Sequence, residues 1–172
     1  LSQDNSNLKT STDSEQINVL DIGGYNSKLA WFLPEKIKLT VLDQISIPQN
    51  GTINYIQGDA THLPLDNDSF DLVISSDLME HLHPQNRLKV ISEMFRVSKS
   101  QIILAAPFQS VFVEQAEKYI NEQFQSYSGN DHPFLIEHFE NGLPDLEIIE
   151  QFLTEKNYSY HKIGEGNIYN WF

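Results

Sequence analysis

Residues 19–27 decide the fold class of this chain, and they read Val19-Leu20-Asp21-Ile22-Gly23-Gly24-Tyr25-Asn26-Ser27. An apolar run leads into an acidic residue and two glycines, and a helix-like pattern follows. In α/β proteins, such a passage from strand to turn holds a nucleotide-like cofactor at the carboxyl end of the first strand. The stretch therefore predicts an α/β domain with a cofactor site at this turn.

Composition limits the classes of protein and partner. The 172 residues suit one domain, and the formal net charge is −13, from 11 basic and 24 acidic side chains. Such a charge, without a Lys/Arg stripe, argues against nucleic acid and against anionic membrane surfaces. The chain has no cysteine, which excludes disulfides and thiolate metal sites. No apolar run approaches the roughly 18 residues of a membrane span. We expect a soluble, cytoplasmic protein.

Short apolar runs alternate with helical patterns after a polar lead-in at 1–16, which we expect to be flexible. This alternation predicts a Rossmann-like three-layer α-β-α sandwich over 17–172, with a mostly parallel central sheet. The expected strands are 17–22, 37–42, 53–56, 70–75, 101–106 and 158–163. The expected helices are 27–33, 84–97, 111–124 and 144–155, while 131–141 is irregular. On the second of the long helices, Phe112, Tyr119 and Phe124 have the spacing of core residues.

Acidic residues end three of the expected strands: Asp21, Asp43 and Asp59. Neighbouring parallel strands end at one edge of the sheet, so these carboxylates should line one crevice. Asp43 comes 22 positions after Asp21, close to the spacing at which an acid meets the ribose hydroxyls of a nucleotide. The alternative is that each aspartate only caps a turn or a helix.

Three segments together resemble the class I S-adenosylmethionine-dependent methyltransferases, of the small-molecule, type 11-like kind. They are Val19-Leu20-Asp21-Ile22-Gly23-Gly24, the segment Gly58-Asp59-Ala60-Thr61-His62-Leu63-Pro64-Leu65, and residues 69–82, which read SFDLVISSDLMEHL. The match runs from about Ile17 to Pro107. The resemblance implies S-adenosylmethionine as cofactor and S-adenosylhomocysteine as product.

The resemblance also implies a role for each cofactor-binding residue. Gly23 and Gly24 would let the backbone approach the methionine part, with Tyr25 in the same cofactor-binding loop. Asp21 would organise that loop, and Ser76 would lie near the transferable methyl. The ribose and adenine would meet Asp43, Gln44, Asp59 and Ala60. The chain has Tyr25 and Ser27 where the family's turn usually has further glycines. The loop can therefore adopt fewer backbone conformations than a turn with more glycines. A noncatalytic domain, used for cofactor sensing or for contact with a fused partner, is the alternative function.

Histidines are the candidates for a catalytic base, because a base is needed where the acceptor must lose a proton. His138 and His132 lie in the segment after the fifth strand, and His81 follows the fourth. The family pattern gives His81 the alternative role of a packing residue at a helix start. His81, His83, His132, His138 and Glu137 could converge on a metal ion, but no His-x-x-x-His pair demands one, and we expect none.

The segment 138–145 resembles methyltransferase domains found beside glycosyltransferases and cell-surface sugar enzymes in bacteria. This weaker likeness favours a small-molecule acceptor such as a sugar or glycan precursor. It also suggests a fused glycosyltransferase as a partner, with a homodimer as the other option. The chain begins with Leu1 rather than Met, and only nine residues follow the last expected strand. We therefore expect a truncated piece, with Trp171 and Phe172 marking a surface that is covered in the longer protein.

Overall fold

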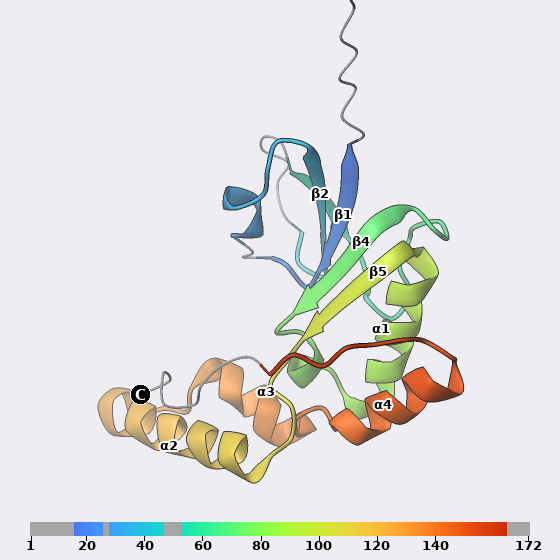
Figure 1. Cartoon of the computed structure of the whole chain (residues 1–172). Helices are drawn as coiled ribbons and strands as arrows, with labels where there is room; N and C mark the ends of the chain where they lie inside the picture. Colours follow the sequence, from blue (N-terminus) through green and yellow to red (C-terminus); the bar gives the residue numbers. More distant parts are fainter. Residues whose placement is uncertain (1–15, 26–27, 47–52, 165–172) are drawn as a thin grey trace, which may run out of the picture.

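The computed structural model describes residues 16–25, 28–46 and 53–164. Within them a parallel sheet has the strand order β3-β2-β1-β4-β5 (Figure 1). The strands are β1 (Ile17–Ile22), β2 (Ile37–Asp43), β3 (Asn54–Gln57), β4 (Phe70–Ser76) and β5 (Ser98–Ala105). This topology confirms the predicted Rossmann-like α/β class. The expected lead-in, Ser27 and the last eight residues lie outside the described residues.

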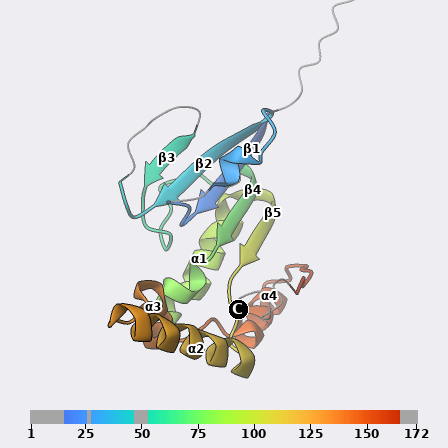
Figure 2. The ribbon, with the colours of Figure 1, turned by 90° about the vertical axis from the view of Figure 1, so that its left-hand side faces the viewer.

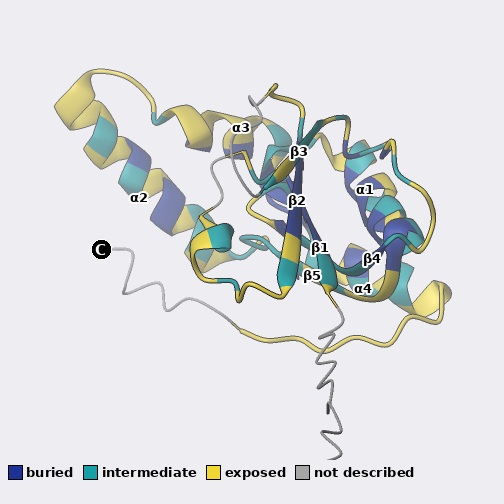
Figure 3. Ribbon diagram, turned by 90° about the horizontal axis from the view of Figure 1, so that it is seen from above, coloured by how far each residue is buried: buried dark blue, intermediate teal, exposed yellow. Residues whose placement is uncertain are grey.

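The central strand β1 is buried on both faces, so its side chains alternate between two cores. Leu20 and Ile22 pack with helices α1 (Pro84–Val97) and α4 (Leu146–Glu155). Val19 packs with Leu39 and Val41 on the other face, where the short 3₁₀ helix η1 (Leu29–Trp31) lies. Figure 3 shows the buried residues gathered along β1, β2 and α1.

Two helices lie beyond the carboxyl ends of the strands rather than against a face of the sheet. They are α2 (Val111–Ser128) and α3 (Pro133–Asn141), and Figures 1 and 2 show both past the tips of β4 and β5. The 3₁₀ helix η2 (Met79–His81), directly after β4, contacts α3. Among the described residues, no helix is both long and apolar enough to span a membrane.

The structure corrects four expectations. The helix predicted at 27–33 is only the single turn η1 in its described part, which ends at Trp31 with Phe32 as its C-cap. The segment 131–141 is not irregular, because Pro133 begins α3 and proline suits a first helical turn. Residues 158–163 form no strand. Phe112 and Tyr119 are not core residues, since they are 74% and 49% exposed on α2.

The chain after α4 packs against helices instead of pairing with β5. The Tyr158 ring stacks on Phe95 of α1 at 3.6 Å between centroids. Lys162 forms a 2.8 Å ion pair with Glu150 of α4. The alternating aromatic residues that suggested a strand are therefore used in contacts with α1 and α4.

Candidate functional site

The ends of β1, β2 and β4 lie side by side at one edge of the sheet. Ile22 is in register with Leu42 of β2 and with Ser75 of β4. The turns that follow are tied to this edge, because Gly23 N–H donates to Leu42 O at 2.8 Å and Gly58 N–H to Asp43 O at 2.9 Å. The structure thus brings the predicted cofactor-binding segments to a common edge.

The two glycines after β1 are each required by the local geometry. Gly23 has a φ of +82°, in the left-handed region that glycine tolerates. A Cβ at Gly24 would lie 2.4 Å from Oδ2 of Asp21, which is 4% exposed. The Asp21 carboxylate therefore packs directly under the turn.

Asp43, at the end of β2, holds two backbone segments with its carboxylate. Its Oδ2 accepts from Tyr25 N–H at 3.1 Å, and its Oδ1 accepts from Ile45 N–H at 3.0 Å. Tyr25 uses its backbone here and leaves its side chain 42% exposed, so this contact does not need the family's glycine at that position. The carboxylate keeps further lone pairs for a ligand, since each oxygen accepts more than one hydrogen bond.

Asp59 follows β3 and is held as an anion by Thr61. The Thr61 N–H and hydroxyl each donate to Oδ1 at 2.8 Å, and these bonds lower the pKa of Asp59 below its usual value. Ala60 beside it is buried. Gln44 is exposed at the same edge, and its carbonyl accepts from the Gln57 side chain at 3.0 Å. Ser76 is exposed at the end of β4, where its hydroxyl donates to Asp77 at 3.2 Å.

Two of the three predicted histidines lie together. The Nδ1 atom of His81 is 2.7 Å from Glu137, the Nδ1 atom of His138 is 2.8 Å from Glu117, and the two ring centroids are 4.8 Å apart. Because a carboxylate can only accept, both rings donate from Nδ1 and direct Nε2 away from these partners. His132 lies apart, packed edge-on against Phe124 at 4.9 Å between centroids.

Glu80 was not singled out from the sequence, yet it lies against these histidines. Ligand atoms of Glu80, His81 and His138 all lie within 4.8 Å of one another. Glu80 is 2% exposed, and burial is the main cause that raises the pKa of its carboxyl to about 7. We call Glu80, His81 and His138, with Glu117 and Glu137 behind the histidines, the Glu80 cluster. Glu80 could have been found from the sequence because it is adjacent to the candidate base His81. Glu117 could not, since nothing in the sequence around it indicates a site.

Arg87 of α1 attaches this cluster to the rest of the chain. It is 8% exposed, and its guanidinium donates to the carbonyls of Met79 and Leu82 at 2.9 and 3.2 Å, beside η2. It also donates to carbonyls between α3 and α4, those of Asn141, Gly142 and Leu143. Burial lowers the pKa of Arg87 from its usual value. The sequence contained no sign of this role.

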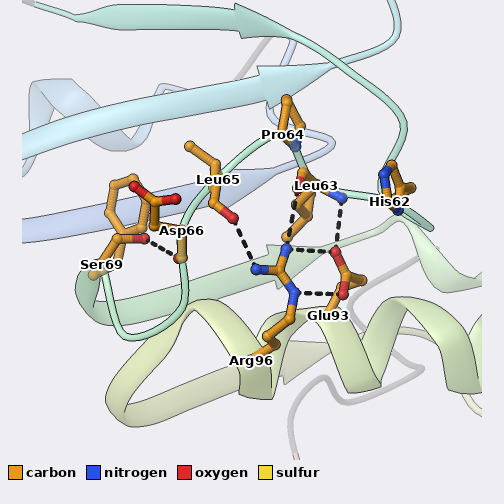
Figure 4. Close-up of a pocket in the computed structure, with 9 residues that line it drawn as sticks. His62, Leu63, Pro64, Leu65, Asp66, Ser69, Glu93 and Arg96 are labelled. Atoms are coloured by element: carbon orange, nitrogen blue, oxygen red, sulfur yellow. Dashed lines mark hydrogen bonds and ion pairs between the residues drawn. The ribbon is translucent and has the colours of Figure 1, made fainter.

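A surface hollow of about 720 Å³ lies between α1 and the segment 62–70 that leads into β4 (Figure 4). Its lining includes Phe70 at the start of β4, and Glu93 and Arg96 near the end of α1. Arg96 pairs with Glu93 at 2.7 Å and donates to the carbonyls of Leu63 and Leu65 at 3.0 and 2.8 Å. These polar groups are thus used to hold the 62–65 loop onto α1, and His62 of the same lining donates from its N–H to the Asp59 carbonyl at 3.0 Å.

Comparison with known families agrees with this geometry. A family model described as a methyltransferase domain matches residues 34–106, from just before β2 to just after β5. The predicted resemblance to class I methyltransferases is confirmed. No protein of curated function matches the chain.

Several solved structures share the methyltransferase fold. The YcgJ protein from Bacillus subtilis is 17% identical with a TM-score of 0.60, and the match covers 87% of this chain and 65% of that one. A putative methyltransferase from Bacillus halodurans is 17% identical with a TM-score of 0.57, over 86% and 62% of the two chains. A putative S-adenosylmethionine-dependent methyltransferase from Methanococcus maripaludis is 17% identical with a TM-score of 0.54, over 88% and 74%. The chain thus spans less than two thirds of the length of the two Bacillus proteins.

Proposed function

We propose that this chain binds S-adenosylmethionine and transfers its methyl group to a small-molecule acceptor, with a sugar or glycan precursor as the favoured acceptor. The observation that carries the proposal is the meeting of Asp21, Asp43 and Asp59 at the carboxyl edge of a β3-β2-β1-β4-β5 sheet, in a chain that matches the methyltransferase domain family. Ligands of open α/β sheets bind at this edge, where the strand order reverses.

The residues at the edge suit the chemistry of the cofactor. Asp43 offers carboxylate lone pairs to a ribose diol, and the ionised Asp59 can accept a hydrogen bond from an exocyclic amino group. The Gly23-Gly24 turn packs against Leu78 and Asp21 on the sides where Cβ atoms would lie, and its backbone would contact the methionine part. When bound, the cofactor supplies a methyl group on a positively charged sulfur. The turn, Asp43 and Asp59 would hold the cofactor in a single orientation.

The acceptor is expected to enter from the side of α2 and α3, which lie beyond the strand ends (Figure 2). Methyl transfer is an in-line displacement, so alignment supplies much of the rate, up to roughly 7–11 kcal/mol of the barrier in favourable cases. His138 and His81 would act at this end as a base or as a clamp for the acceptor. Carboxylates and imidazoles suit a hydroxyl-rich acceptor, which agrees with the likeness of 138–145 to sugar-linked methyltransferase domains.

Calorimetric titration with S-adenosylmethionine, S-adenosylhomocysteine and NAD tests the cofactor. We expect micromolar binding of the first two and no binding of NAD. Absence of binding by all three would overturn the proposal and favour the noncatalytic alternative. Binding would be followed by a screen of sugar acceptors, with S-adenosylhomocysteine formation as the readout.

Matched variants connect this titration to the site. Asp43→Ala should weaken binding of both sulfur compounds by about tenfold or more, since it removes charge-assisted hydrogen bonds. Glu35→Ala is the control, because Glu35 is an exposed acid just before β2, at the opposite end of that strand. Equal affinity of the Asp43 variant and the parent would remove Asp43 from the site.

His138→Ala should keep cofactor affinity and slow turnover more than twofold.

A further inference from the structure

The Glu80 cluster contains two buried atoms that lack the partners their chemistry requires. Glu80 Oε2 and His138 Nε2 are both buried and have no hydrogen-bond partner among the described residues. Glu80 is 2% exposed and His138 is 9% exposed. Buried polar groups are nearly always paired, and an exception indicates an absent water, ion or ligand. Both unpartnered atoms belong to residues of the same triad, with His81 as its third member.

The surroundings of the two histidines determine which ring atom is free. Glu117 accepts from His138 Nδ1 and Glu137 accepts from His81 Nδ1. This carboxylate-to-histidine arrangement is the one that fixes the tautomer and the orientation of metal-binding histidines. It leaves both Nε2 lone pairs available to a ligand.

The charge of the cluster also calls for a cation. Three glutamates, Glu80, Glu117 and Glu137, surround two imidazoles. The nearby guanidinium of Arg87 donates to backbone carbonyls. A bound dication would neutralise the buried carboxylate and satisfy both orphaned atoms together.

We propose that Glu80, His81 and His138 bind one divalent transition-metal ion, with zinc as the preferred cation. Two histidines and one glutamate form a ligand set of catalytic zinc sites, which keep a further position open. Ligands of tetrahedral zinc lie about 3.3 Å apart, so the side chains must move closer from separations of up to 4.8 Å. If the chain transfers methyl groups as proposed above, the open position would bind an acceptor oxygen, and His138 would be a ligand rather than a base.

Metal content and affinity test the site without requiring methyl transfer. The chain is stripped with EDTA, titrated with Zn²⁺ and, separately, with Mg²⁺, and analysed by calorimetry and by elemental analysis after gel filtration. We expect one Zn²⁺ per chain and much weaker Mg²⁺ binding, because Mg²⁺ prefers oxygen ligands. Replacement by Co²⁺ should give the absorption of a four- or five-coordinate ion.

Variants locate the ion on the cluster. His138→Ala and the nearly isosteric Glu80→Gln should each lower zinc affinity by about 100-fold, and Glu117→Gln by about tenfold. His83→Asn is the control: His83 is exposed, caps α1 and lies outside the triad, so zinc affinity should not change. Circular dichroism would show that each variant is folded.

Two results would overturn the proposal: no stoichiometric zinc in the parent, or equal zinc affinity of the parent and folded Glu80→Gln. Either would leave the cluster as a set of buried charge pairs. Cofactor titration separates the two proposals. Zinc bound without S-adenosylmethionine binding would support the metal site alone, and the reverse result would support the cofactor site alone.

Discussion

Glu80 is a buried carboxyl whose protonation should affect stability. The folded chain raises its pKa from 4.5 to about 7, mainly through burial. Between these values the folded state binds a proton that the unfolded state releases, so this group's contribution to stability is full at low pH and falls as pH rises to 7. In EDTA, we expect urea unfolding to show a loss of up to about 3 kcal/mol over this window.

Glu80→Gln is the matched control for this pH effect, because the amide keeps the shape and cannot ionise. At pH 5 the variant should be about as stable as the parent, and at pH 8 it should be more stable. Parallel pH profiles for the two proteins would show that Glu80 does not carry the effect.

Gly24 is the residue at which a single added methyl group should disturb the cofactor turn. In Gly24→Ala the new Cβ would meet Asp21 Oδ2 at 2.4 Å, so the carboxylate or the turn must move. We expect a loss of about 1–3 kcal/mol in unfolding free energy and weaker S-adenosylhomocysteine binding. Gly164→Ala is the control, because nothing lies within 4 Å of a Cβ there. Unchanged binding by the Gly24 variant would show that the turn does not contact the cofactor.

At the scale of elements, the Arg96–Glu93 pair connects α1 to the loop that follows Asp59 and Ala60. Arg96→Ala would free the carbonyls of Leu63 and Leu65 and should cost about 1–3 kcal/mol by chemical denaturation. Faster amide exchange is expected in residues 59–65. Lys99→Ala removes a half-exposed pair with Asp71 and should cost at most about 1 kcal/mol. Equal losses for the two variants would contradict the role of Arg96 as a clamp.

Elements with a strong local signal were predictable from the sequence, and elements defined by distant partners were not. Pro84 and a 3.6-residue stripe gave α1 its observed bounds, Pro84–Val97. The alternation at 158–163 looked like a strand, but α1 and α4 offer Phe95 and Glu150 as partners instead. Likewise, the positions of Asp21, Asp43 and Asp59 at strand ends could be predicted from the order of strands and turns in the sequence. The burial of Glu80 could not, because it depends on α3, which is more than 50 residues away in the sequence.

At the scale of the whole molecule, Arg87 joins the sheet half to the α2–α3 half. Arg87→Lys keeps the charge but removes the planar fork that reaches the carbonyls of both η2 and the α3–α4 turn. We expect a loss of about 2–4 kcal/mol in unfolding free energy. Hydrogen exchange should rise in α3 and η2 more than in β1. An equal increase in exchange rate in α3, η2 and β1 would show that Arg87 has no special role in joining the halves.

The choice of backbone carbonyls as partners for Arg87 has an evolutionary consequence. Carbonyls are present whatever the side chain, so the hydrogen bonds from Arg87 do not depend on side-chain identity at 141–143. Gly142 is restricted for another reason, because its φ of +66° favours glycine. Related chains could therefore change exposed residues of α2 and α3 and keep the same attachment through Arg87. The arginine itself has no such freedom, and we expect it to change far more slowly than the exposed residues of α2 and α3.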